Sequence, residues 1–162
     1  MSIESVRNYL RQWNRDKDII EMEASTATVI EAANALAVIP ARIAKSISLK
    51  QEDRIAVVVI AGDMKLDNHK YKEHFGIKAR MLSPEEALSR TGHAVGGVCP
   101  FALPDGVDVY LDVSMRRFRT VFPACGSGNS AIELTLDELD LFSRNTALVD
   151  LCKPLTQNAG ID

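Results

Sequence analysis

Apolar and polar residues alternate along several stretches of the chain, as half-buried β-strands require. The alternation is clear over 46–50 and 107–111, and a continuous β-branched run over 55–60 is typical of a central strand buried on both faces. Similar patterns predict strands over 19–23, 79–82, 119–124, 131–134 and 147–151. The chain is therefore expected to form a sheet of about seven short strands.

Helices are predicted where apolar residues recur at three- and four-residue spacing, or where a capping residue begins a turn. The spacing predicts a helix over 2–13, and two capping boxes, Thr28/Glu31 and Thr135/Glu138, begin helices that end near 38 and 143. Further helices are expected over 41–44, 66–75 and 83–92. Because the helices are spaced unevenly between the strands, the regular alternation of a doubly wound fold is absent. The predicted fold class is α/β of the α+β type, with a mixed, partly barrel-like β-sheet surrounded by helices.

The composition fits one ordinary domain. Of 162 residues, 46% are hydrophobic and 25% are charged, which suffices for a buried core. We expect a single domain over 1–162, with an N-terminal helical extension over 1–18 and a frayed tail over 153–162. The longest apolar run, 55–61, is far shorter than the ~18 residues that span a bilayer, and no secretory signal is recognisable. A cytoplasmic protein without membrane contact is expected.

The net charge of −3 excludes a protein that coats nucleic acid through its overall field, but a local basic patch remains compatible with it. The densest basic cluster is Arg116, Arg117 and Arg119, which either binds a phosphodiester end or faces solvent. The cysteines are odd in number, widely spaced and without a CxxC pair, so the sequence supports neither a structural zinc site nor a disulfide framework, and we predict buried thiols and no metal site. They are Cys99, Cys125 and Cys152.

The stretch 92–101 carries the most unusual backbone chemistry. Gly96 and Gly97 remove two neighbouring β-carbons, and Pro100 removes a backbone donor shortly afterwards. Such a loop is either a bulge within the sheet or the floor of a pocket that uses main-chain amides. Lys45, which is expected between a short helix and a strand, either holds a phosphate or a carbonyl oxygen or extends along the surface.

An ordered set of blocks resembles the YbaK/prolyl-tRNA-synthetase-associated domain family. The blocks are 28–33, 40–46, 92–101, 124–127 and 132–134, and the resemblance runs from about 19 to 142. It implies a compact α/β domain with a barrel-like mixed sheet. It also implies a trans-editing deacylase that hydrolyses the ester of mischarged tRNA, typically Cys-tRNA(Pro) or Ala-tRNA(Pro), without a cofactor. Ala102 stands where many relatives have glycine, which puts the amino-acid preference in doubt.

The resemblance also implies roles for individual residues. Lys45, Gly96 and Gly97 are implied as catalytic: the glycine amides would stabilise an oxyanion, and Lys45 would bind the terminal phosphate or orient the ester carbonyl. No side chain serves as the nucleophile, and the 2′-hydroxyl of the terminal adenosine assists. Residues expected to bind substrate or line the pocket are Thr26, Arg42, His93, Cys99, Pro100, Gly126 and Ser127. The implied partners are the 3′ acceptor end of aminoacyl-tRNA and prolyl-tRNA synthetase. The alternative is a tRNA- or nucleotide-binding module without turnover, or a subunit that works on a synthetase.

Overall fold

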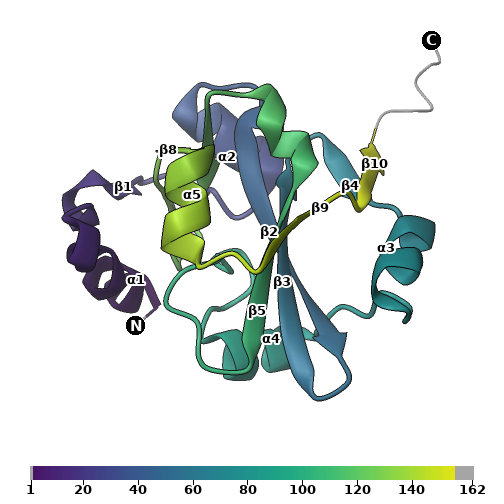
Figure 1. Cartoon of the computed structure of the whole chain (residues 1–162). Helices are drawn as coiled ribbons and strands as arrows, with labels where there is room; N and C mark the ends of the chain where they lie inside the picture. Colours follow the sequence, from purple (N-terminus) through teal and green to yellow (C-terminus); the bar gives the residue numbers. More distant parts are fainter. Residues whose placement is uncertain (1, 156–162) are drawn as a thin grey trace, which may run out of the picture.

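A mixed six-stranded sheet organises the protein, whose computed structural model describes residues 2–155 (Figure 1). The strand order is β8-β6-β2-β3-β5-β9. The strands are β2 (Ile43–Gln51), β3 (Arg54–Ala61), β5 (Val107–Asp112), β6 (Thr120–Pro123), β8 (Leu134–Thr135) and β9 (Ala147–Val149). β2 and β3 form a long antiparallel hairpin, whereas β2–β6, β3–β5 and β5–β9 are parallel pairs. The prediction of a mixed, curled sheet with helices around it is confirmed.

Two short ribbons complete the strands. β1 (Ile20–Glu21) pairs with β7 (Ser130–Ala131), and β4 (Met64–Leu66) pairs with β10 (Cys152–Pro154). The prediction of a frayed tail from 153 was wrong at its start, because β10 pairs there with β4; residues 156–162 lie outside the described part. The predicted strand over 79–82 is reduced to one bridge, Leu49 to Met81, and the predicted strand over 131–134 is divided between β7 and β8.

Five α-helices surround the sheet in the described residues. They are α1 (Ser2–Leu10), α2 (Val29–Leu36), α3 (Asn68–Phe75), α4 (Pro84–Thr91) and α5 (Leu136–Ser143). The capping boxes at Ser83 and Thr135 are complete, whereas Thr28 caps α2 with its own hydroxyl only. The N-terminal extension is helical as predicted, with 3-10 turns following α1. Because Leu66 belongs to β4, α3 begins later than expected, after the N-cap Asp67.

One error in the predicted element boundaries affects the position of a candidate site residue. The predicted short helix over 41–44 is a 3-10 turn, Pro40–Arg42, and β2 begins directly after it at Ile43. Lys45 therefore lies inside a strand rather than at a helix-to-strand junction. The reason is that the antiparallel partner β3 extends to Ala61, which pairs with Ala44 and extends the hairpin back to the turn.

The sheet separates two apolar clusters. Val57 and Val59 face the larger cluster, which includes residues of α1, α5 and the loop after α4, whereas Val58 and Ile60 face a smaller one against α3 and β10. This burial on both faces explains the continuous β-branched run of β3. Figure 1 shows α1 and α5 on one side of the sheet and α3 on the other. In the part of the chain that the structure describes, no helix has the length and apolarity to cross a membrane.

Candidate functional site

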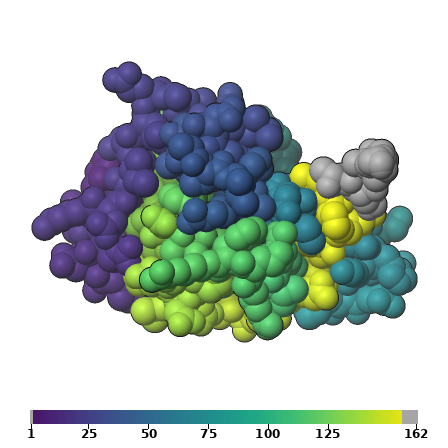
Figure 2. Space-filling view, turned by 90° about the horizontal axis from the view of Figure 1, so that it is seen from above, coloured from purple at the N-terminus to yellow at the C-terminus, as the bar shows by residue number. Residues whose placement is uncertain are grey.

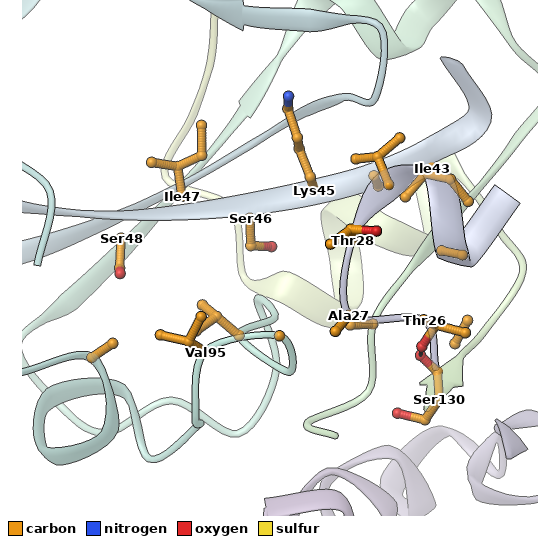
Figure 3. Close-up of a pocket in the computed structure, with 18 of the residues that line it drawn as sticks. Thr26, Ala27, Thr28, Ile43, Lys45, Ser46, Ile47, Ser48, Val95 and Ser130 are labelled. Carbon is orange, nitrogen blue, oxygen red and sulfur yellow. Dashed lines mark hydrogen bonds between the residues drawn. The ribbon is translucent and has the colours of Figure 1, made fainter. Parts of the chain in front are cut away.

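A cavity of about 320 Å³ lies against β2. Its walls come from the segment before α2, from β2 itself, from the loop after α4 (residues 94–98, the glycine loop) and from β7 (Figure 3). The residues that line it include Thr26, Ala27, Thr28, Ile43, Lys45, Ser46, Ile47, Ser48, Val95, Gly96, Val98, Phe122 and Ser130. Small side chains and hydroxyl groups predominate, and Lys45 is the one ionisable residue among the described residues that line the cavity.

The cavity forms beside a part of the β2 edge that no described strand covers. β3 pairs with β2 along its length, but on the other edge β6 reaches only Ile43 and Ala44. Farther along this edge, the Ser48 carbonyl accepts a hydrogen bond from Leu82 N–H at 3.1 Å. Main-chain groups two residues apart in a strand face the same edge. The N–H and C=O of Ser46 therefore also face this edge, and no described strand pairs with them.

The hydroxyl of Ser46 points into the same cavity. Among the described residues, Ser46 Oγ is the buried side-chain polar atom that lacks a hydrogen-bond partner. A buried hydroxyl without a partner costs free energy, roughly 1–3 kcal/mol, and a ligand that bonds to it would recover that cost. Figure 3 shows Ser46 and Ser48 on the side of β2 that faces Val95 of the glycine loop.

The ammonium group of Lys45 lies on the opposite face of β2 (Figure 3). Burial lowers the pKa of this half-buried lysine, and the nearby Asp63 and Cys152 oppose that shift. Asp63 is itself paired with Arg117, whose Nη2 lies 2.6 Å from Asp63 Oδ1. Lys45 and Gly96 thus line one cavity, as expected, but the ammonium does not point at the glycine loop.

The two central glycines of the loop have different surroundings. Gly96 adopts φ of +94°, lines the cavity, and its amide has no hydrogen-bond partner in the described residues. Gly97 is buried and does not line the cavity; its N–H donates to the Ala94 carbonyl at 2.9 Å. A β-carbon on Gly97 would lie 2.7 Å from main-chain atoms of Gly126, so the site requires glycine there for close packing. Of the two amides expected to bind an oxyanion, that of Gly97 is already engaged.

The remaining predicted substrate-binding residues are divided between the cavity and its surroundings. Thr26 is buried in the cavity wall, and its hydroxyl donates to the Ser130 carbonyl at 3.4 Å. Gly126 and Ser127 support that wall from behind, since Ser127 Oγ donates to Ser130 Oγ at 2.8 Å. Neither of them lines the cavity.

The other predicted positions lie farther away. His93 and Cys99 are fully buried behind the glycine loop, not in the cavity lining, and Pro100 faces a separate hollow. Arg42 lies in a neighbouring open groove with Arg117 and Arg119. The structure therefore brings together Thr26, Lys45 and Gly96 of the predicted set.

Sequence analysis missed Ser46, Ser48 and Ser130. The signal for the first two was present, because both occupy the polar positions of the alternating strand. Such positions ordinarily face water. Here the glycine loop and the segment before α2 cover that face. The alternation of polar and apolar residues in the strand does not indicate that other segments cover it.

The cavity at an open strand edge, bounded by a glycine loop within a curled mixed sheet, defines a small-ligand site in an α/β domain. The aminoacyl-tRNA editing domain family matches residues 23–142, and the chain belongs to this family. It is 56% identical over 154 residues to the uncharacterized protein YwhH of Bacillus subtilis (strain 168), covering 94% of this chain and 98% of that protein.

Two further similarities connect the family to prolyl-tRNA synthetase. The chain is 28% identical over 119 residues to the proline–tRNA ligase of Kosmotoga olearia, covering 68% of this chain but only 20% of the ligase. A crystal structure of a proposed trans-editing enzyme for prolyl-tRNA synthetase superposes with a TM-score of 0.85 at 28% identity. That superposition covers 94% of this chain and 97% of the other.

Proposed function

We propose that this protein is a trans-editing aminoacyl-tRNA deacylase that hydrolyses the ester of mischarged tRNA, with Cys-tRNA(Pro) or Ala-tRNA(Pro) as substrate. The observation that carries the proposal is the Ser46 edge of β2, which no described strand pairs, in a small cavity that Gly96 also lines. Family membership and the similarity to proline–tRNA ligases support the choice of substrate class.

In this proposal the aminoacyl group lies in the cavity, against the Ser46 face of β2. The α-amino group and the ester carbonyl find acceptors and donors in the main chain and hydroxyl of Ser46. The Gly96 amide is the donor for the oxyanion that forms when water attacks; loss of one such donor costs about 10²–10³ in rate. Lys45, on the other face of β2, binds the phosphate of the terminal nucleotide, so the strand edge separates the phosphate from the ester.

The base for the reaction comes from the substrate. Within residues 2–155, Lys45 is the one ionisable residue of the cavity lining, and its ammonium points to the other face. Cys99 is a poor nucleophile because burial raises the pKa of its thiol to about 12, and it lies behind the loop. A ribose hydroxyl next to the ester is therefore the group that orients or activates the attacking water.

A basic groove supports RNA as the carrier of the ester. Arg42, Arg117 and Arg119 line it, and Arg42 stacks at 5.1 Å over the ring of Phe122, which also lines the cavity. The groove thus begins beside the cavity. Figure 2 shows two of the segments that form it side by side on one face, the blue segment 29–42 and the green segment 113–120; Glu133 and Thr135 also line the groove. Guanidinium groups in this position suit the phosphates of an acceptor strand.

The second candidate is a tRNA-binding module without turnover or a synthetase-associated subunit. In the part of the chain that the structure describes, no ionisable group of the cavity lining points toward the proposed ester position, which favours this second candidate. A panel of tRNA(Pro) charged with cysteine, alanine and proline separates the two. Turnover of the mischarged species, with Pro-tRNA(Pro) spared, supports the deacylase. Binding of all three without loss of the ester contradicts the deacylase and favours the module.

A further inference from the structure

On the side of the glycine loop that faces away from the cavity, one histidine side chain contacts the first residue of α1. His93 is fully buried, with Nε2 2.8 Å from the Phe101 carbonyl oxygen and Nδ1 in contact with Ser2 Oγ. Its main-chain N–H donates to Thr91 Oγ1 at 3.1 Å. These contacts tie the entry and the exit of the loop to the start of a helix that is remote in sequence.

The partners of the ring determine its protonation. A carbonyl oxygen only accepts, so Nε2 carries the proton, and in a neutral ring Nδ1 then accepts from the Ser2 hydroxyl. Cys99 Sγ lies 3.5 Å from Nε2 and is the one titratable neighbour in contact with the ring among the described residues. The ring therefore has one donor and one acceptor, and both are used. The proposed hydrolysis has no role for it as an acid or base.

Packing continues from the same residue to the cavity. A β-carbon on Gly126 would lie 2.8 Å from the Ser2 carbonyl oxygen, and one on Gly97 would lie 2.7 Å from Gly126. Gly96, which directly precedes Gly97 in the chain, lines the cavity. Ser2, Gly126 and Gly97 thus form a stack without free space, which ends at the loop amide that faces the substrate in the proposed function.

We propose that His93, held by Ser2, is a positioning residue that sets the conformation of the 94–98 segment. In this way α1 contributes to the site. The family match begins at residue 23 and leaves α1 outside it, yet α1 contacts the loop that the site depends on. The catalytic part of this inference rests on the proposed function. The structural part, the order of the loop, is measurable without any substrate.

Four variants separate positioning from general stability. Ser2→Ala and His93→Leu remove the contact, whereas His93→Gln keeps a donor and an acceptor on a side chain of similar reach. Tyr9→Phe is the matched control, because it removes another bond of α1, from Tyr9 Oη to the Phe142 carbonyl at 2.5 Å, which does not involve the loop. Ser2→Ala is a small change at the half-exposed end of a helix. If His93→Leu does not fold, Ser2→Ala alone tests the contact.

Two measurements are made on each variant: hydrogen exchange of the two bonded amides of the loop, those of His93 and Gly97, which donate to Thr91 Oγ1 and to the Ala94 carbonyl, and kcat and KM for mischarged tRNA. We expect exchange of these amides to rise about tenfold and kcat to fall about tenfold in Ser2→Ala and His93→Leu, with KM within about twofold. His93→Gln should restore both values, and Tyr9→Phe should change neither. The inference is overturned if Ser2→Ala behaves like the wild type, or if Tyr9→Phe produces the same losses. If the wild type hydrolyses no ester, the proposed function fails, and hydrogen exchange still decides whether Ser2 and His93 order the loop.

Discussion

Lys45 and Ser46 are neighbours in the chain, yet their side chains lie on opposite faces of β2. The Ser46 hydroxyl lies in the cavity with the glycine loop, and the Lys45 ammonium lies toward Asp63 and Cys152. A ligand that reaches both must pass over the unpaired edge of the strand. The terminal nucleotide of an aminoacyl-tRNA has its ester and its phosphate on different sides of one ribose, which suits such an arrangement.

The role of Lys45 can be tested by removing the phosphate from the substrate. We expect Lys45→Ala to reduce deacylation of mischarged tRNA(Pro) by at least about 100-fold, because a buried phosphate loses its counter-charge. The same variant should act almost normally on aminoacyl-adenosine, which has no such phosphate. Equal losses on both substrates would show that Lys45 orients the ester instead. Lys50→Ala is the control, since Lys50 is exposed on the same strand and pairs with Glu86.

The Gly96 position should tolerate a methyl group poorly for reasons of function. Gly96→Ala puts a β-carbon 3.0 Å from Ala27 Cβ, at φ of +94°. Gly106→Ala has the same backbone strain, φ of +93°, in open space. We expect both variants to lose about 1 kcal/mol of unfolding free energy in urea titrations, and only Gly96→Ala to lose most of its kcat. Equal activities would argue against an oxyanion role for this loop.

Cys99 should be dispensable for catalysis. Cys99→Ala is expected to keep most of the wild-type kcat, while the small cavity it leaves costs about 1 kcal/mol of stability. The native thiol should resist iodoacetamide at pH 8 because its pKa is raised to about 12. Mass spectrometry of native and urea-unfolded protein measures the modification. Rapid labelling of the native protein with loss of activity would contradict this assignment.

His93 should make stability depend on pH in a defined window. Burial lowers the pKa of His93 below its ordinary value of 6.5, so the unfolded chain binds more protons below that pH. Its contribution is complete above pH 6.5 and is lost as pH falls below it. The Cys99 thiol beside the ring stays neutral throughout this window. Urea titrations between pH 7.5 and about 5 should show a steeper loss for the wild type than for His93→Gln. Parallel curves would contradict the prediction.

The arginine groove should contribute to RNA affinity through charge. Arg119 is exposed and lines the groove without an ion-pair partner in the described residues. We expect Arg119→Glu to weaken binding of an acceptor-stem hairpin several-fold and to reduce the slope of log K against log salt by about 1. Arg90→Glu, at an exposed position on α4, is the charge-matched control. An identical slope for the two variants would exclude the groove as the RNA path.

The sequence by itself determined most of the element types, the mixed sheet and the family. Each of these depends on local patterns: the β-branched run of β3, the capping residues Ser83 and Thr135, and the ordered glycine blocks. Its errors are the helix expected over 41–44, the strand expected over 79–82 and the tail expected from 153. At the start of β2 and at β10, a distant partner extended or created a strand.

The tertiary structure decided which of the candidate residues meet. Sequence order places Gly96 and Gly97 together, but packing against Gly126 buries Gly97 and leaves Gly96 at the cavity. Sequence order also places His93 and Cys99 on either side of the glycine loop, and folding buries both side chains behind it. It does not reveal that Ser46 faces a cavity rather than water, or that Ser2 contacts His93. These facts depend on contacts between residues far apart in the chain, and local periodicity contains no information about them.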